Sequence, residues 1–185
     1  MTTPDSASAI ADIQRWLKRA VIGLNLCPFA KAVQAKGQVH FASCDDDSFA
    51  GVLDALGREA GALLGMDSAE RDTTLLVLPR GFDDFLLFND LVREGDRLLS
   101  RRGLDGVLQL ASFHPRFHFA DAAEDDPGNN SNRAPHPTLH LLREASIDRA
   151  VEAFPDAEAI FGANIGKLRA LGAEGWAALD VGASP

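Results

Sequence analysis

The chain has 185 residues, of which 46% are hydrophobic and 24% charged, and this balance is too apolar for an intrinsically disordered protein. The length suits one globular domain, so we expect residues 1–185 to form a single domain with a disordered tail at 1–8. The formal net charge of -9 repels a polyanion such as DNA or RNA on average, which disfavours nucleic-acid binding as the main role.

Cysteine usage and the N-terminus indicate the compartment. The two cysteines, Cys27 and Cys44, are too few for a disulfide framework and suit a reducing environment. The N-terminal residues lack the basic segment of a signal peptide, and no apolar run approaches the roughly 20 residues of a membrane span. We therefore predict a cytoplasmic protein with no membrane partner, of unknown oligomeric state.

Hydrophobic periodicity predicts helices and strands in alternation. Such alternation is typical of an α/β fold, or of an α+β fold, with a small, mostly parallel or mixed sheet of about four strands covered by helices. The last strand follows a long polar loop rather than a helix, so we expect it to pair antiparallel. The expected elements are helix 8–24, strand 38–43, helix 48–64, strand 73–78, helix 83–102, strand 107–112, functional loop 120–137, strand 138–143, helix 146–154 and helix 157–171.

Three segments carry polar residues that a core does not need, namely 23–29, 113–119 and 129–144. Ligand sites in sheets with parallel strands form beyond the carboxyl ends of those strands. The second segment leaves the end of a predicted strand, and the long loop follows it directly. We therefore expect the three segments to meet at one polar site.

Histidines are concentrated in this part of the chain, with four of the five between positions 114 and 140. His114 and His140 lie on or beside successive predicted strands, and Glu144 would add an oxygen ligand to a divalent metal bound there. However, no strong metal motif such as H-E-x-x-H or C-x-x-C is present. Proton transfer by His114 and His140 is the preferred hypothesis, and a metal site the weaker one.

Cys27 follows the first predicted helix and is the candidate nucleophile. A thiolate needs a nearby base or cation, which His114 or His140 would supply, while Asn25 would orient the substrate or donate to an oxyanion. The alternative is a small buried side chain at a helix end. Cys44 adjoins three acidic residues, which disfavour a thiolate, so it is the weaker candidate.

Arginines in the same region predict a small anionic ligand, because a guanidinium pairs bidentately with carboxylate or phosphate. Arg133 and the neighbouring Asn132, in an Asn-rich loop, are interpreted as substrate-binding residues. Arg143 on the last strand is a further candidate, with a salt bridge inside the fold as its alternative. Asn129 and Asn130 are interpreted as turn residues.

The segments Val21-Ile22-Gly23-Leu24-Asn25-Leu26-Cys27-Pro28-Phe29-Ala30, Phe113-His114-Pro115 and 132–144, together with Trp16-Leu17, resemble the defining segments of a bacterial family. That family is known only as a domain of unknown function, and the resemblance covers nearly the whole chain. It implies that the same three segments define the family, but it supplies no reaction. The family motif fixes no histidine at the position of His136, so we leave His136 out of the site.

Three hypotheses from different classes follow. The first is a small-molecule enzyme that carries out group transfer or hydrolysis on an anionic substrate with a Cys/His/Arg site. The alternative is a non-catalytic module that binds a metal or an anion through the same residues. A third hypothesis, a protein-interaction domain with a structural loop, needs no ligand at all.

Overall fold

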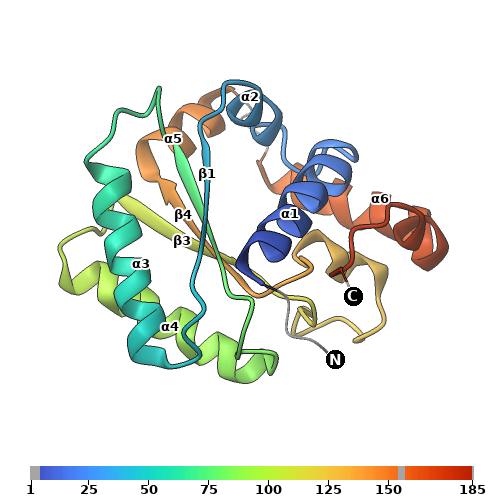
Figure 1. Ribbon diagram of the computed structural model, residues 1–185. Helices are drawn as coiled ribbons and strands as arrows, with labels where there is room; N and C mark the ends of the chain where they lie inside the picture. The colour runs from blue at the N-terminus through green and yellow to red at the C-terminus, as the bar shows by residue number, and fades with distance from the viewer. Residues whose placement is uncertain (1–4, 154–156, 185) are drawn as a thin grey trace.

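The computed structural model describes residues 5–153 and 157–184. Their four-stranded sheet has the order β1 (Val39–Ser43), β2 (Thr73–Val77), β4 (Thr138–Arg143), β3 (Leu108–Phe113). β1 and β2 are parallel, whereas β4 is antiparallel to both β2 and β3. The predicted α/β fold with a mixed sheet is confirmed, and helices cover both faces of the sheet (Figure 1).

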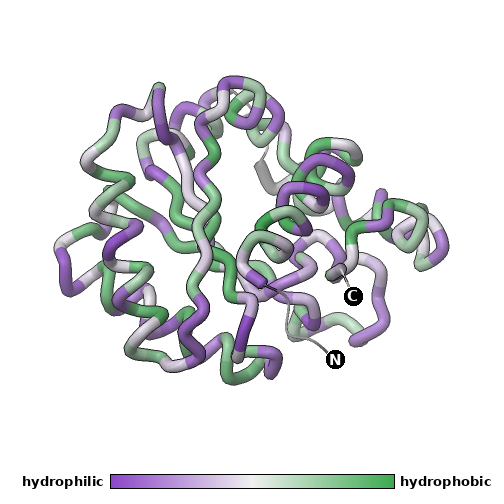
Figure 2. Tube along the Cα trace, in the orientation of Figure 1, coloured by the Kyte–Doolittle hydropathy of each residue, from purple (hydrophilic) through white to green (hydrophobic). Residues whose placement is uncertain are grey.

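The two central strands separate two apolar cores by alternation of their side chains. Leu76 of β2 and Leu141 of β4 are buried in the core on one face, while Leu75 and Val77 are buried in the core on the other. His140 stands opposite Leu75 in the register, on the same face as Leu75. The tube in Figure 2 shows the hydrophobic residues gathered along these strands and the inner sides of the helices.

One face is covered by α3 (Phe49–Leu64) and α4 (Phe85–Arg101). Each helix begins at a capping side chain: the hydroxyl of Ser48 accepts from the backbone N–H of Gly51, and the carboxylate of Asp84 accepts from that of Leu87. These bonds satisfy donors that a helix start leaves open. The fully buried side chains Leu56, Leu63, Phe88 and Leu91 pack on the sheet from these helices.

The other face is covered by α1 (Ser6–Trp16), which continues into the π-helical segment η1 (Leu17–Ile22). Buried residues of the two, Ile13 and Ala20 among them, pack on Leu75 and Val77. Asn25, with a φ of 52°, ends the helical path in the left-handed conformation that asparagine tolerates. The short helix α2 (Ala30–Ala35) follows.

The chain between β3 and β4 is long, and it contains the 3-10 helix η2 (Pro127–Ser131). After β4 come α5 (Glu144–Ala153) and α6 (Ala157–Ala178), and α6 packs against η2. Gly172 interrupts α6 with a φ of 68°, at the position where the sequence predicts the helix to end. Helix α6 nevertheless resumes beyond it.

Boundaries of several predicted elements differ from the structure. The first helix begins at Ser6, inside the segment predicted as a tail, and changes to π geometry after Trp16. Phe154, the predicted end of the helix after β4, lies outside the described residues. Helix α2 has no counterpart in the prediction. None of the helices in the described ranges is both long and apolar enough to cross a membrane.

Two helical glycines test how tightly the α3–α4 face is packed. A Cβ added at Gly95 of α4 would lie 2.7 Å from Leu110 Cδ2 and 3.0 Å from Leu56 Cδ2, whereas one added at Gly61 of α3 meets nothing within 4 Å. Gly61→Ala should stabilise by about 0.5–1 kcal/mol through helix propensity. Gly95→Ala should be the less stable variant by about 1–2 kcal/mol because of overpacking. Urea unfolding of both variants measures the difference, and equal stabilities would contradict the packing.

Candidate functional site

A cavity of about 430 Å³ lies on the α1 side of the sheet, and both Cys27 and His140 line it. We call it the Cys27–His140 cavity. Its volume is typical of small-molecule sites. Its walls are mainly apolar and come from η1, the strands and α5: Leu17, Val21, Val39, Leu75, Phe113, Leu142 and Ile147. All three segments picked out from the sequence therefore contribute to this cavity, the second of them through Phe113.

Cys27 reaches this cavity because of the turn that ends η1. The backbone N–H of Leu26 donates to the carbonyl of Val21 at 2.8 Å, which folds the chain back under the helix end. Cys27 is a free, half-buried cysteine. Asn25 contributes its left-handed backbone and a carbonyl that accepts from Lys167 Nζ at 3.3 Å, but it does not line the cavity. The structure thus gives Asn25 a role in the turn.

Thr73 determines how the His140 ring is hydrogen-bonded. Thr73 Oγ1 lies 2.6 Å from the carbonyl oxygen of Leu141 and 2.6 Å from Nε2 of His140. A hydroxyl has one proton, and only Thr73 can supply the proton between Oγ1 and the carbonyl. Nε2 of His140 must therefore carry a proton and donate it to Oγ1. The other ring nitrogen, Nδ1, bonds to no residue in the described part of the chain.

Burial keeps the His140 ring uncharged. Desolvation lowers the pKa of His140 to about 4, because the surrounding apolar walls disfavour an imidazolium. At neutral pH the ring is then the Nε2–H tautomer with a lone pair on Nδ1. The cavity accordingly contains a hydrogen-bond acceptor set among apolar side chains.

Trp16 also lines the cavity, and sequence reasoning did not single it out as a site residue. The ring packs edge-on against Phe113 with centroids 4.9 Å apart. The indole Nε1 is buried and has no hydrogen-bond partner among the described residues. A buried donor without an acceptor costs about 1–3 kcal/mol. No sequence pattern reveals such an unpaired group, because helical spacing marks Trp16 only as a core residue.

His114 does not join this site, contrary to the prediction. It is fully buried on the opposite face, between the rings of Phe85 and Phe88. Its Nδ1 accepts from the backbone N–H of Arg116 at 3.0 Å, so Nε2 carries the proton and donates to the carbonyl of Phe82 at 2.9 Å. Burial lowers the pKa of His114, and both ring nitrogens are already used. The ring fastens the end of β3 to the loop before α4.

Arg143 lines the Cys27–His140 cavity, but its guanidinium is already engaged. Its Nη2 donates to the carbonyls of Leu63 and Met66 at 2.5 and 2.8 Å, and to that of Arg71 at 3.1 Å. These bonds tie the end of α3 to the segment that enters β2. They satisfy carbonyls that a helix end leaves open. The alternative reading, a structural role, fits this geometry better than anion binding, although the partners are carbonyls rather than a salt bridge.

The predicted metal ligands are not brought together. His114 and His140 lie on opposite faces of the sheet, and Glu144 begins α5. Among the residues that the structure describes, no group of three or more His, Cys, Asp or Glu side chains could hold a metal ion. The alternation of side chains along a strand is the physical reason, since Phe113 faces the cavity and His114 is the next residue.

Arg133 lies in a second, separate groove of about 470 Å³, together with Asn130. Its Nε donates to the carbonyl of Phe117 at 2.8 Å and its Nη2 to that of Glu124 at 2.7 Å. Asn132 is not in the groove lining, and its side chain accepts from Ser131 Oγ at 3.0 Å. The expectation that the third segment contributes Arg133 to the same site as Cys27 is therefore wrong.

Sequence reasoning also passed over a buried polar cluster around Asp12. Asp12 is fully buried and accepts from His136 Nε2 at 2.9 Å, from Arg15 at 2.8 Å and from Ser184 Oγ at 2.6 Å. Burial alone would raise the pKa of Asp12, but these hydrogen bonds outweigh it and hold the pKa below its usual value. Asp12 looks like one polar residue in a helical pattern, so the spacing gives no hint of its burial. His136, which the prediction left out of the site, is hydrogen-bonded to Asp12 in this cluster.

The low pKa of His140 predicts a pH-dependent stability. The folded-state pKa, about 4, is below the value of 6.5 for an unfolded chain, so the folded protein binds fewer protons between those values. The contribution of His140 to the free energy of unfolding is therefore fully present above pH 6.5 and is lost as the pH falls toward 4. The free energy of unfolding should drop between pH 7 and pH 5 by about 2 kcal/mol more in the native protein than in His140→Gln. Parallel urea titrations would contradict the assignment if the two proteins lost the same amount.

Comparison with known proteins agrees with the resemblance seen in the segments. A family described as "Protein of unknown function (DUF1415)" matches residues 8–178. The searches of curated proteins and of solved structures gave no match. The matched residues include Cys27, Thr73 and His140, and also Asn130 and Arg133 of the second groove. Because the match extends over most of its length, the chain belongs to this family of proteins of unknown function.

Proposed function

We propose that the chain binds a small, uncharged and mainly apolar molecule in the Cys27–His140 cavity. The observation that carries the proposal is Nδ1 of a neutral His140, which has no partner among the described residues and lies in an apolar cavity of about 430 Å³. Apolar walls supply affinity by removing ligand surface from water, and one well-placed polar group orients the ligand. The ligand would donate an O–H or N–H to Nδ1.

The charges around the cavity support an uncharged ligand rather than the anion expected from the sequence. The guanidinium of Arg143 is engaged by carbonyl groups. The carboxylate of Asp72, which also lines the cavity, accepts from Ser146 Oγ at 2.6 Å and would repel an anion. Arg133 belongs to the other groove. Arg143 and Asp72 line this cavity together, so their opposite charges offset each other, and an anion would lose its hydration for little net attraction.

The pKa of His140 also bears on whether its ring serves as a hydrogen-bond acceptor or as a base that deprotonates Cys27. With a pKa of about 4, the His140 ring is a weak base and stays uncharged at neutral pH. A resting thiolate–imidazolium pair is therefore disfavoured in the empty cavity. His140 acts first as a hydrogen-bond acceptor, which places ligand binding ahead of catalysis.

Catalysis at Cys27 is the second candidate, favoured by one observation: the thiol lines the same cavity as the ligand. The sulfur of Cys27 would attack the carbonyl carbon of an apolar ester or thioester bound there. A carbon–sulfur bond forms, the bond to the leaving group breaks, and the thiol proton passes to the leaving group or to solvent. Water or a second acceptor would then release the acyl group.

Protection of Cys27 from alkylation tests ligand binding. We expect 1-naphthol, which has an apolar body and one O–H, to slow the reaction of Cys27 with iodoacetamide at least about fivefold. 1-Methoxynaphthalene, which lacks the donor, should need about ten times the concentration, since one hydrogen bond contributes about 1–1.5 kcal/mol. Mass spectrometry of the labelled peptides reads both cysteines in one sample. Cys44, buried elsewhere with hydrogen bonds to Asp46 and Gly51, serves as the internal control.

His140→Phe completes this test, because it keeps a ring but removes the acceptor. The preference for 1-naphthol over its methyl ether should disappear in this variant. Equal protection by the two compounds in the native protein, or protection of Cys44 as well, would contradict specific binding through Nδ1.

Acylation by p-nitrophenyl hexanoate tests the enzyme candidate separately. We expect a burst of about one equivalent of p-nitrophenolate per chain and a hexanoyl adduct on Cys27, because the acyl chain matches the apolar walls. Cys27→Ser should lose both, and Cys44→Ser should keep both. Release at the same rate from Cys27→Ser would exclude Cys27 as the nucleophile and leave the binding proposal intact.

A further inference from the structure

The groove that contains Arg133 carries an independent inference. We call it the Asn130–Arg133 groove. It opens between the loop after β3, η2 and the C-terminal segment, and it is separate from the Cys27–His140 cavity. Its volume is about 470 Å³. The larger apolar side chains in its walls are Pro115, Pro127, Pro135, Trp176 and Val181.

Asn130 is a largely buried residue whose side chain has no partner among the residues that the structure describes. The residue is 7% exposed, and its carbonyl accepts from the backbone N–H of Arg133 at 3.4 Å. Its side-chain amide makes no hydrogen bond with any residue in the described ranges. The neighbouring Asn129 shows the contrast: its amide donates to Ala123 and Glu124, and its Oδ1 accepts from Phe119. Most of Asn130 is buried, but its unbonded amide remains accessible in the groove, where a ligand can reach it.

Arg133 adds an open donor beside this amide. Its Nε and Nη2 donate to the carbonyls of Phe117 and Glu124, which fixes the plane of the guanidinium. Its Nη1 has no acceptor in the part of the chain that the structure describes. Burial lowers the pKa of Arg133, and the charge of Glu124 offsets this in part. A bound anion would therefore stabilise the charge of the Arg133 guanidinium, which Glu124 compensates only in part.

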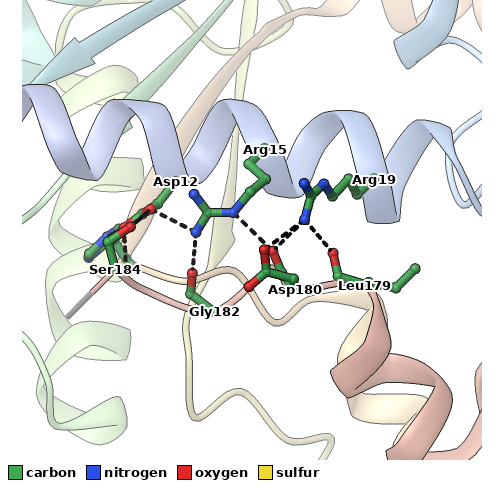
Figure 3. Close-up of polar contacts among 8 residues, drawn as sticks. Asp12, Arg15, Arg19, Leu179, Asp180, Gly182 and Ser184 are labelled. Atoms are coloured by element: carbon green, nitrogen blue, oxygen red, sulfur yellow. Dashed lines mark hydrogen bonds and ion pairs between the residues drawn. The ribbon is translucent and has the colours of Figure 1, made fainter.

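One wall of the groove is formed by residues 181–183, and this segment is bonded to two arginines on α1 and η1 (Figure 3). Arg15 donates to the carbonyls of Asp180 and Gly182 at 2.9 and 2.7 Å, and Arg19 pairs with the carboxylate of Asp180. These bonds hold residues 179–184 in place. The wall is thus formed before any ligand arrives, which lowers the entropic cost of binding.

We propose that the Asn130–Arg133 groove binds a small monocarboxylate. The carboxylate accepts from Nη1 of Arg133 and from Nδ2 of Asn130, and the apolar part of the ligand packs on Trp176 and the prolines. A single charge is favoured over the double charge of phosphate, because the groove holds one guanidinium and is also lined by the exposed carboxylate of Asp125.

Benzoate is the probe, and calorimetry with Trp fluorescence is the measurement. Native protein should bind benzoate with at least tenfold higher affinity than benzamide, which has no charge. Asn130→Leu, of similar size, should bind benzoate at least tenfold more weakly while its urea unfolding midpoint stays equal or rises, because no internal hydrogen bond is lost. Asn129→Leu is the matched control, and its unfolding midpoint should fall. Asn130→Asp, which adds a like charge, should abolish binding.

Three results would overturn the proposal. The first is native-like affinity for benzoate in Asn130→Leu. The second is a lower unfolding midpoint in that variant, which would give the amide a structural role. The third is tighter binding of inorganic phosphate than of benzoate. Because the groove lies apart from Cys27, protection of Cys27 by 1-naphthol should be the same in Asn130→Leu and in the native protein.

Discussion

A single hydroxyl proton on Thr73 fixes the chemistry of the Cys27–His140 cavity. Because that proton goes to the Leu141 carbonyl, the Oγ1 lone pair must accept from His140, and the imidazole is held with Nδ1 unprotonated. The apolar walls then keep the ring uncharged, with a pKa of about 4. Side-chain alternation on two paired strands thus orients an acceptor inside a hydrophobic cavity, and a neighbouring turn adds a thiol.

Most of the polar side chains that the sequence suggested as site residues are bonded to backbone carbonyls instead. Arg143, Arg133 and His114 each donate to backbone carbonyls at the ends of helices or in long loops. Buried carbonyls require partners, and a guanidinium satisfies several at once. Several polar groups have no partner among the described residues and are open to a ligand, among them Nδ1 of His140 in one cavity and the amide of Asn130 with Nη1 of Arg133 in the other groove. The two sites therefore have different electrostatic characters, one neutral and one cationic.

Periodicity was sufficient to predict the α/β fold, the four strands and the antiparallel pairing of β4, because those features depend on local patterns of two and 3.6 residues. The π-helical end of α1 and the short helix α2 leave no such pattern. The position of His140 beside Cys27 was partly foreseen, but His114 was assigned to the wrong face. Its side follows from the register in which Ala111 pairs with His140, and because a long loop rather than a tight turn joins β3 to β4, turn geometry does not specify that register. Thr73, Asp12 and Asn130 were missed because burial, not residue type, gives them their importance.

The most direct test of this account is the ring ¹⁵N spectrum of His140, assigned by comparison with His140→Gln and recorded between pH 3.5 and 8. At neutral pH the spectrum should show a neutral ring with protonated Nε2 and a bare Nδ1, and Nδ1 should become protonated only near pH 4. An imidazolium at pH 6, or the tautomer with the proton on Nδ1, would contradict it.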